Sequence, residues 1–255
     1  MPVQTDQAVV LRLADYSESS QVVSLFTARS GLVRLLFKGA RRSSRTRVAT
    51  GLDLLEYGTL GYAPARAGAG LGILTEWVQL DAFTGLRSDL FCQYAAFYAA
   101  ESISRLTEEY DPHPELFAAL LALLRGLAGS TSQPQAPGSP SSPAACLVQF
   151  QTALLRAIGY APVLSRCVGC GRSQTRGTVA YFSSTAGGLL CRDCEMHHAE
   201  KRRLPPGLLD ADAAARSAAE WFALLDYHLT HIAGGPLHTA QTLHTLLKNP
   251  GRGGA

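Results

Sequence analysis

The sequence has few charges and lacks the segments that mark several large protein classes. Of its 255 residues, 17% are charged and 47% are hydrophobic, which is typical of a globular chain that buries a core. No run approaches the about eighteen apolar residues of a membrane span, and the N-terminal residues have neither the basic nor the apolar region of a signal peptide. The net charge of +3 is too small to identify a partner. We therefore expect a globular protein of one or two domains.

Catalytic signatures are also missing. The sequence contains no Walker A loop, no dinucleotide-binding glycine fingerprint, no G-x-S-x-G and, among its seven histidines, no H-E-x-x-H pattern. No paired carboxylates stand out. We therefore expect the protein not to be an enzyme. The alternative, a cryptic active site, would show itself as turnover on nucleic acid.

Cysteine is scarce, but four of the six cysteines form a specific pattern. They make two C-x₂-C pairs with twenty residues between the pairs, Cys167/Cys170 and Cys191/Cys194. This spacing predicts four thiolates around one tetrahedral Zn²⁺. Because the protein then fills every coordination position and leaves none for water, we expect one structural zinc ion per chain. A redox pair or disulfides are the alternatives.

The residues around these cysteines agree with a metal site. Gly169 and Gly171 suit a tight turn whose backbone N–H groups point at the sulfurs. Three cations that could offset the charge of a zinc–tetrathiolate centre flank the ligands: Arg166, Arg172 and Arg192. The two remaining cysteines, Cys92 and Cys146, add no second pattern. Such cysteine usage predicts a reducing cytoplasm.

The first eighty residues read as five short strands. The expected strands are residues 6–13, 21–27, 32–38, 54–62 and 71–80. In the first, Val9, Leu11 and Leu13 alternate on one face. A turn ending at Gly31, where positive φ is expected, joins the second and third strands. Five short strands in this length predict a closed barrel of OB type, with an SH3-like barrel as the alternative.

In the third expected strand, every second residue is apolar. Val33, Leu35 and Phe37 share one face, and Arg34 and Lys38 lie on the other. This alternation is typical of a strand with one buried face.

The period changes to helical from about residue 86. Helices are expected around residues 90–106, 115–127, 147–158, 213–232 and 237–248, and a Ser/Pro-rich loop at 129–144. The fold class is thus α+β and multidomain, with a five-stranded OB-type barrel followed by an all-α domain that carries a Cys₄ zinc-ribbon-like insertion. We expect the barrel domain to span residues 1–82 and the helical domain 83–255, with its zinc-binding segment at 165–195.

A basic segment directly follows the third expected strand. It holds five cations and no carboxylate within ten residues: Lys38, Arg41, Arg42, Arg45 and Arg47. Spaced cations on a polar segment can follow a phosphate backbone, so these residues are the predicted DNA contacts. The alternative is a solvated charged loop, which the predicted barrel makes less favoured because OB surfaces often carry single strands.

Weaker candidates lie elsewhere. Tyr57, Tyr62 and Trp77 fall on expected strands and could stack on bases, although packing is the commoner role of such residues. The short basic patch at residues 201–203 could extend a DNA path, although a solvated face is the preferred interpretation.

Taken in order, these features resemble the RecO family of bacterial recombination mediators. The resemblance rests on KGARR at 38–42, LDLLEY at 52–57, LRAIGYAP at 155–162, CVGCG at 167–171, FS at 182–183 and GGLLCRDC at 187–194. It covers most of the chain. The sequence departs from the family's pattern in its Ser/Pro-rich segment and in having few Lys and Arg residues after Arg216, which puts partner contacts there in doubt.

The resemblance implies a non-enzymatic DNA repair protein. It implies binding to single- and double-stranded DNA, annealing of complementary strands, and cooperation with RecR and single-stranded-DNA-binding protein in loading RecA. The expected localisation is cytoplasmic, in association with the nucleoid. An RNA-binding or ribosome-associated OB protein with a structural zinc ribbon remains the alternative, and a preference for RNA over DNA would favour it.

Overall fold

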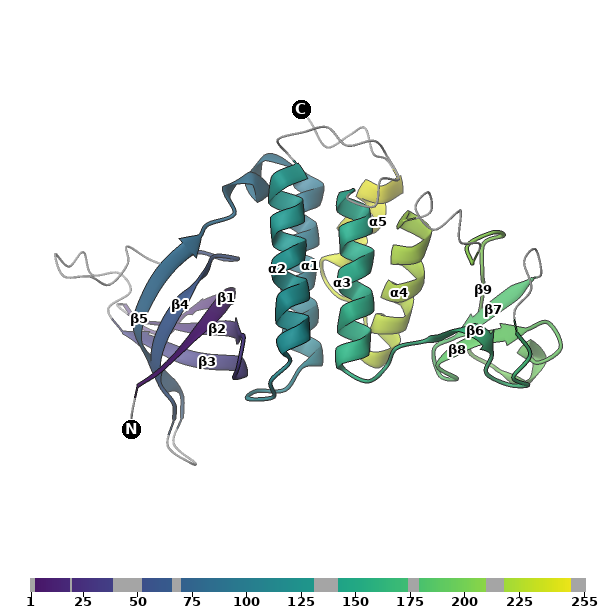
Figure 1. The fold of residues 1–255 in the computed structure, drawn as a ribbon, viewed down its shortest axis with the longest axis horizontal. Coiled ribbons are helices and arrows are strands. Elements are labelled where there is room, and N and C mark those ends of the chain that lie inside the picture. The colour runs from purple at the N-terminus through teal and green to yellow at the C-terminus, as the bar shows by residue number, and fades with distance from the viewer. Residues whose placement is uncertain are drawn as a thin grey trace.

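The computed structural model describes residues 3–18, 20–38, 52–65, 70–130, 142–173, 179–209 and 218–248. A barrel, a group of helices and a small sheet follow one another along the longest axis of the molecule (Figure 1). The chain visits them in this order and then returns from the small sheet to the helices for α4 and α5. This is the α+β multidomain architecture predicted from the sequence.

Five strands form a closed barrel in the order β1-β2-β3-β5-β4. They are β1 Gln4–Asp15, β2 Ser20–Thr27, β3 Gly31–Lys38, β4 Tyr57–Ala63 and β5 Gly72–Asp81. β3 and β5 pair in parallel, and the other pairs, including β1 with β4, are antiparallel. The barrel confirms the predicted OB-type fold.

Alternate residues of β3 fill the barrel. Val33, Leu35 and Phe37 are at most 2% exposed and belong to the barrel core. Arg34 and Lys38 lie on the opposite face and are exposed. The predicted alternation is therefore confirmed for this strand.

β1, in contrast, is buried on both faces. Ala8 and Val10 belong to the barrel core, whereas Val9 and Leu11 pack in the core shared with the helices. The prediction that Leu13 lies on the same face as Val9 and Leu11 is wrong: Leu13 is only partly buried and packs against the barrel core. The reason is a register shift in the pairing with β2 just after Val10, which changes the face that the following residues occupy.

The turn between β2 and β3 joins the barrel to the helices. Gly31 has a φ of +70°, as the turn prediction required. A Cβ atom at this position would lie only 2.0 Å from the backbone oxygen of Asp111, in the connection between α1 and α2. The same connection donates a hydrogen bond of 2.9 Å from the Tyr110 N–H to the Leu32 carbonyl. A side chain at Gly31 would therefore displace this contact between the two parts.

The helical part contains five α-helices among the described residues. They are α1 Leu90–Leu106, α2 Pro114–Ser130, α3 Pro143–Ala157, α4 Ala218–Ile232 and α5 Ala240–Lys248, preceded by the short 3₁₀ helix η1 Thr84–Ser88. Their apolar faces and one side of the barrel share a single core, to which β1, β2 and the helices all contribute. In the part of the chain that is described, no helix is long and apolar enough to cross a membrane.

The helices extend into the Ser/Pro-rich segment from both ends. α2 continues to Ser130, and α3 begins at Pro143. Ser142 caps α3, because its Oγ accepts a hydrogen bond of 3.3 Å from the Ala145 N–H, and a proline is favourable at the next position. The predicted loop at 129–144 was thus too long at both ends, and its central residues 131–141 lie outside the described residues.

The small sheet is inserted between α3 and α4. Its order is β6-β8-β7-β9, with strands β6 Val163–Cys167, β7 Ala180–Ser183, β8 Gly188–Cys191 and β9 Arg202–Arg203, and the 3₁₀ helix η2 Glu195–His197 follows β8. Phe182, Leu189 and Leu204 form its buried core together with Leu224 of α4. The sheet is therefore packed directly on the helical part.

Candidate metal centre and nucleic-acid interface

Four cysteine sulfurs meet at the small sheet. Cys167 ends β6 and Cys191 ends β8, and each precedes the second cysteine of its pair by three positions. The four Sγ atoms of Cys167, Cys170, Cys191 and Cys194 lie within 4.8 Å of one another, and those of Cys170 and Cys191 are 3.8 Å apart. Thiolates placed tetrahedrally about 2.3 Å from a zinc ion would be about 3.8 Å apart. The cluster can therefore hold a metal ion.

Backbone amides favour the thiolate form of Cys167, the form that binds a metal. The Cys191 N–H donates a hydrogen bond of 3.3 Å to the Sγ of Cys167. Burial alone would raise the pKa of the Cys167 thiol, but the N–H groups of Cys191, Cys170 and Gly169 lower it. A Cβ atom at Gly169 would lie 3.1 Å from the side chain of Cys194, so this glycine lets the turn approach the second pair closely.

The arginines near the cluster have different surroundings. Arg172 forms an ion pair of 3.1 Å with Asp193, which lies between the two cysteines of the second pair. Its charge also acts on Cys170 and Cys191. Arg166 and Arg192 are exposed. Arg172 thus shares its charge between a carboxylate and the sulfurs rather than serving the cluster alone.

Glu200 fastens the small sheet to α4. Its carboxylate accepts hydrogen bonds from the Ser183 hydroxyl at 2.9 Å and the Thr185 N–H at 2.8 Å, both from the sheet, and from the Tyr227 hydroxyl of α4. Burial would raise the pKa of Glu200, but these hydrogen bonds outweigh it and lower the pKa to about 2. No sequence pattern indicates this role, since the contacts join segments that are distant along the chain.

A buried histidine makes a second link at the same place. His228 of α4 is 1% exposed. Its Nε2 lies 3.0 Å from the Tyr160 carbonyl oxygen, and its Nδ1 lies 2.6 Å from the Ser184 Oγ. Because a carbonyl only accepts, Nε2 carries the proton and Nδ1 accepts from the serine hydroxyl. Burial lowers the pKa of His228, and the hydrogen bond to the Tyr160 carbonyl only partly offsets this.

The predicted DNA contacts fall largely beyond what the structure describes. Lys38 is the last residue of β3 and is exposed at the barrel surface. The other four predicted contacts, Arg41, Arg42, Arg45 and Arg47, lie outside the described residues. They remain predictions from the sequence.

The three aromatic candidates for base stacking are buried. Tyr57, Tyr62 and Trp77 are 8%, 1% and 4% exposed. Tyr57 packs against Phe117 of α2, and Tyr62 and Trp77 belong to the barrel core. Their faces are therefore unavailable to nucleic acid, and the packing interpretation is the right one.

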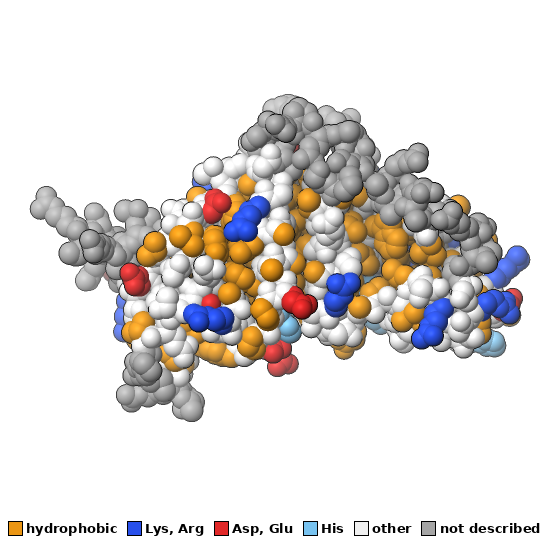
Figure 2. All heavy atoms as spheres, in the orientation of Figure 1, with side chains coloured by type: hydrophobic (Ala, Val, Ile, Leu, Met, Phe, Trp, Pro, Cys, Tyr) orange, Lys and Arg blue, Asp and Glu red, His pale blue; other side chains and the backbone are white. Residues whose placement is uncertain are grey.

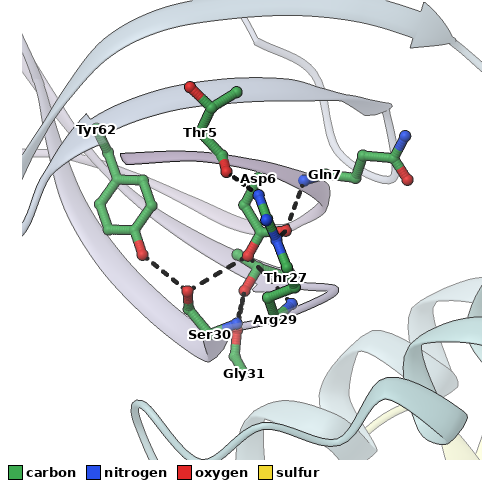
Figure 3. Close-up of polar contacts among 8 residues, drawn as sticks. All are labelled: Thr5, Asp6, Gln7, Thr27, Arg29, Ser30, Gly31 and Tyr62. Atoms are coloured by element: carbon green, nitrogen blue, oxygen red, sulfur yellow. Dashed lines mark hydrogen bonds and ion pairs between the residues drawn. The ribbon is translucent and has the colours of Figure 1, made fainter. Parts of the chain in front are cut away.

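A buried carboxylate organises one end of the barrel (Figure 3). Asp6 is 4% exposed and accepts hydrogen bonds from the N–H groups of Gln7 and Arg29, at 2.8 and 3.1 Å, and from the Ser30 hydroxyl at 3.3 Å. The Tyr62 hydroxyl donates in turn to Ser30 at 2.9 Å. This network holds the β2–β3 turn that contacts the helices. Sequence reasoning missed it, because nothing local to Asp6 marks a buried acid.

The basic patch at residues 201–203 is mostly engaged within the protein. Lys201 forms an ion pair with Glu195, and the Arg202 guanidinium lies 5.6 Å from the centre of the Tyr227 ring and donates to a carbonyl of α4. Arg203 is exposed. Figure 2 nevertheless shows Lys and Arg side chains gathered at the end of the molecule that carries the small sheet. All three residues are exposed, as the interpretation as a solvated face implied, although Lys201 and Arg202 also contact the protein.

Two family profiles match the chain one after the other. The profile described as "Recombination protein O N terminal" matches residues 1–83, and "Recombination protein O C terminal" matches residues 87–224. The chain belongs to the RecO family. The first RecO profile covers the barrel, and the second covers α1–α3, the four cysteines and the beginning of α4.

Relatives named DNA repair protein RecO extend over most of the chain. That of Rhodopirellula baltica is 31% identical over 223 residues, which are 80% of this chain and 78% of the relative. That of Anaeromyxobacter sp. strain K is 39% identical over 189 residues, 73% of this chain and 68% of the relative. That of Roseiflexus sp. strain RS-1 is 35% identical, covering 75% of this chain and 62% of the relative. These similarities confirm the resemblance to RecO drawn from the sequence.

Proposed function

We propose that this protein is a DNA-binding recombination mediator in a RecFOR-type repair pathway. It binds single- and double-stranded DNA, anneals complementary strands and helps to load RecA on coated single strands. The observation that carries the proposal is the match to the RecO family over both the barrel and the helical part. The partners we propose are DNA, RecR and single-stranded-DNA-binding protein, with RecA as an indirect partner, at the nucleoid in the cytoplasm.

The proposed division of labour follows the architecture. Residues 1–82 form the DNA-binding domain and residues 83–255 the helical domain, with the metal-binding segment at 165–195. The closed barrel provides the platform. Lys38, the last residue of β3, lies on its surface and begins the basic segment. Cations that contact only the phosphate backbone of the DNA would leave the base edges free to pair, which annealing requires.

Annealing needs no nucleotide cycle. Two phosphate backbones repel each other, so a protein that offsets this repulsion accelerates a reaction that is already downhill. The sequence contains no phosphate-binding loop that would couple strand pairing to ATP hydrolysis. We therefore propose binding without enzymatic turnover.

The metal in this proposal is one structural Zn²⁺ per chain, held by the four cysteines. Four thiolates complete the shell and favour zinc over harder cations. The ion would tie the ends of β6 and β8 together in a segment whose own core is small.

A strand-annealing assay tests the function. Complementary oligonucleotides, bare or coated with single-stranded-DNA-binding protein, are mixed with the full-length protein at moderate salt without ATP. We expect duplex formation to be faster than in protein-free controls on both substrates. An unaccelerated rate on both bare and coated strands would rule out the mediator. A clear preference for RNA strands would instead support the RNA-binding alternative.

A further inference from the structure

A pocket of about 880 Å³ lies where α1, the α4–α5 connection and α5 meet. Its floor includes the buried residues Leu237 and Ala240. Most of the other lining residues are polar, and they include Arg105, Asp226, His238, Gln241, His244 and Lys248. Pockets of roughly 300–1,000 Å³ are of the size that takes small organic ligands.

The family match assigns no role to this pocket. Arg105 is the one polar lining residue named above that lies within the matched range, because the second profile ends at residue 224. Its described lining residues include neither Lys38 nor any of the four cysteines. Any ligand it takes is therefore additional to the proposed annealing function.

The only carboxylate among the described lining residues already has hydrogen-bond partners. Asp226 is 5% exposed, and both of its oxygens have partners. Oδ1 accepts from the buried Tyr98 hydroxyl at 2.9 Å, and Oδ2 lies 2.7 Å from Nε2 of His244. Gln151 extends the chain of contacts by donating to the Tyr98 hydroxyl at 2.9 Å. Both carboxylate oxygens are thus occupied, one by the buried Tyr98 hydroxyl and the other by His244.

The cations, in contrast, keep their charge available. Arg105 donates to the carbonyls of Pro236 and Ala233 at 2.7 and 3.1 Å. Carbonyls do not neutralise a guanidinium, and of its five N–H donors three remain. Lys248, in the last turn of α5, is exposed, and neither it nor Arg105 forms an ion pair with another described residue. The arginine is thus fixed in position, which suits a binding site.

We propose that this pocket binds a phosphate-bearing ligand of nucleotide size. Four donor side chains line it: Arg105, Lys248, His238 and Gln241. A carboxylate offers two acceptor oxygens, whereas a terminal phosphate offers three, so a phosphate uses such a set more fully. The apolar floor, which includes Leu237 and Ala240, can pack against the uncharged part of the ligand.

Calorimetric titration of the full-length protein tests this, with adenosine 5′-monophosphate as the first probe and malonate and adenosine as comparisons. We expect saturable one-to-one binding of the nucleotide and at least tenfold weaker binding of malonate and adenosine. Lys248→Gln should weaken nucleotide binding by about fivefold. Arg156→Gln removes a cation from the last turn of α3, outside the pocket, and should leave the affinity unchanged.

A second pair of probes shows whether the terminal phosphate belongs to a DNA end or to a free nucleotide. A thymidine oligonucleotide with a 5′-phosphate is compared with the same oligonucleotide ending in a hydroxyl. If the natural ligand is a DNA end, the phosphate should tighten binding in the parent and not in Lys248→Gln; if it is a free nucleotide, the mononucleotide alone should show the Lys248 dependence. Equal binding of malonate, equal losses in the Lys248 and Arg156 variants, or no saturable binding would overturn the proposal. The annealing assay on unphosphorylated strands is unaffected by either outcome.

Discussion

Glu101 and Arg105 lie one helical turn apart on α1 and hold opposite ends of the α4–α5 connection. The Glu101 carboxylate accepts hydrogen bonds from the N–H groups of His238 and Thr239, at 2.7 and 3.0 Å, just before α5 begins. Arg105 donates to two carbonyls after the end of α4. The acid thus accepts from two amides just before the start of α5, and the base donates to the carbonyl that follows α4 and to one within the connection. α1 fixes the last two helices through these two charges.

Replacing Glu101 by Gln should therefore destabilise the protein. The neutral amide is a weaker acceptor for the N–H groups that precede α5, and we expect a loss of about 1–2 kcal/mol in the free energy of unfolding. Urea titration followed by circular dichroism measures it. Glu108→Gln is the control, because Glu108 is exposed and lies just beyond the end of α1. Equal stability of the two variants would show that the contacts to Glu101 contribute nothing.

The sequence was informative wherever the pattern is local. Val33, Leu35 and Phe37 alternate as a strand with one buried face should, and the cysteine spacing indicated a cluster whose sulfurs do lie together. Periodicity was misleading for β1, because both of its faces are covered and a register shift follows Val10.

What the sequence could not reveal depends on partners that are distant along the chain. Asp6 accepts hydrogen bonds from Arg29 and Ser30 in the β2–β3 turn. Glu101 accepts hydrogen bonds from residues just before α5, more than 130 positions later in the sequence. No local composition distinguishes these acids from solvated ones. Only the packing of β1 on the β2–β3 turn and of α1 on α5 decides their role.

His228 should make the protein less stable in mild acid. Its pKa is lowered in the folded state by burial, from an ordinary value of 6.5, so the unfolded chain binds the proton more readily. The contribution is fully present above pH 6.5 and is lost as the pH falls below it. Unfolding free energies at pH 7.5 and 5.5 measure the difference. His228→Gln should be less stable at pH 7.5 but less sensitive to this pH change, whereas His238→Gln, at an exposed position, should keep the parent's sensitivity. An unchanged pH dependence in His228→Gln would contradict the assignment.

Glu200 should make the stability of the protein depend on pH in a more acidic range than His228 does. Because the pKa of Glu200 is lowered to about 2, its stabilisation is present above the ordinary value of 4.5 and is lost as the pH falls from 4.5 toward 2. Glu200→Gln should lower the melting temperature at pH 6 and make little difference near pH 2. Scanning calorimetry at the two values provides the measurement. A constant difference between variant and parent would mean that the charge of Glu200 is not what joins the sheet to α4.

Removing one metal ligand should reduce stability without removing a chemical step. We expect Cys170→Ala to lose the bound zinc and to melt about 5 °C or more below the parent, because binding energy at such sites is folding energy. Elemental analysis should give one zinc per chain for the parent and for Cys146→Ala, whose cysteine lies on α3, away from the cluster. Parent protein purified without chelators that contains no zinc would refute the metal assignment.

The basic segment that begins at Lys38 should make DNA binding depend strongly on salt. If the five cations Lys38, Arg41, Arg42, Arg45 and Arg47 engage phosphates of a single strand, the logarithm of affinity should fall with the logarithm of salt concentration at a slope of about −3. Arg41→Ala/Arg42→Ala should weaken binding to all sequences alike and reduce that slope by about one to one and a half, because phosphate contacts carry no base information. Fluorescence anisotropy with two oligonucleotides of different sequence, at several salt concentrations, measures both effects.

The matched control for this pair is Arg166→Ala/Arg192→Ala, which removes two exposed cations beside the cysteine cluster instead. That variant keeps the segment after β3 intact, so its slope should stay near the parent's. If the control loses more affinity than Arg41→Ala/Arg42→Ala, the strand runs over the small sheet, where Figure 2 shows cations gathered, and not over the barrel. Equal binding of the Arg41/Arg42 variant and the parent at every salt concentration would exclude these two arginines from the interface. Because annealing depends on offsetting phosphate repulsion, the variant that flattens the salt slope should also be the one that slows duplex formation.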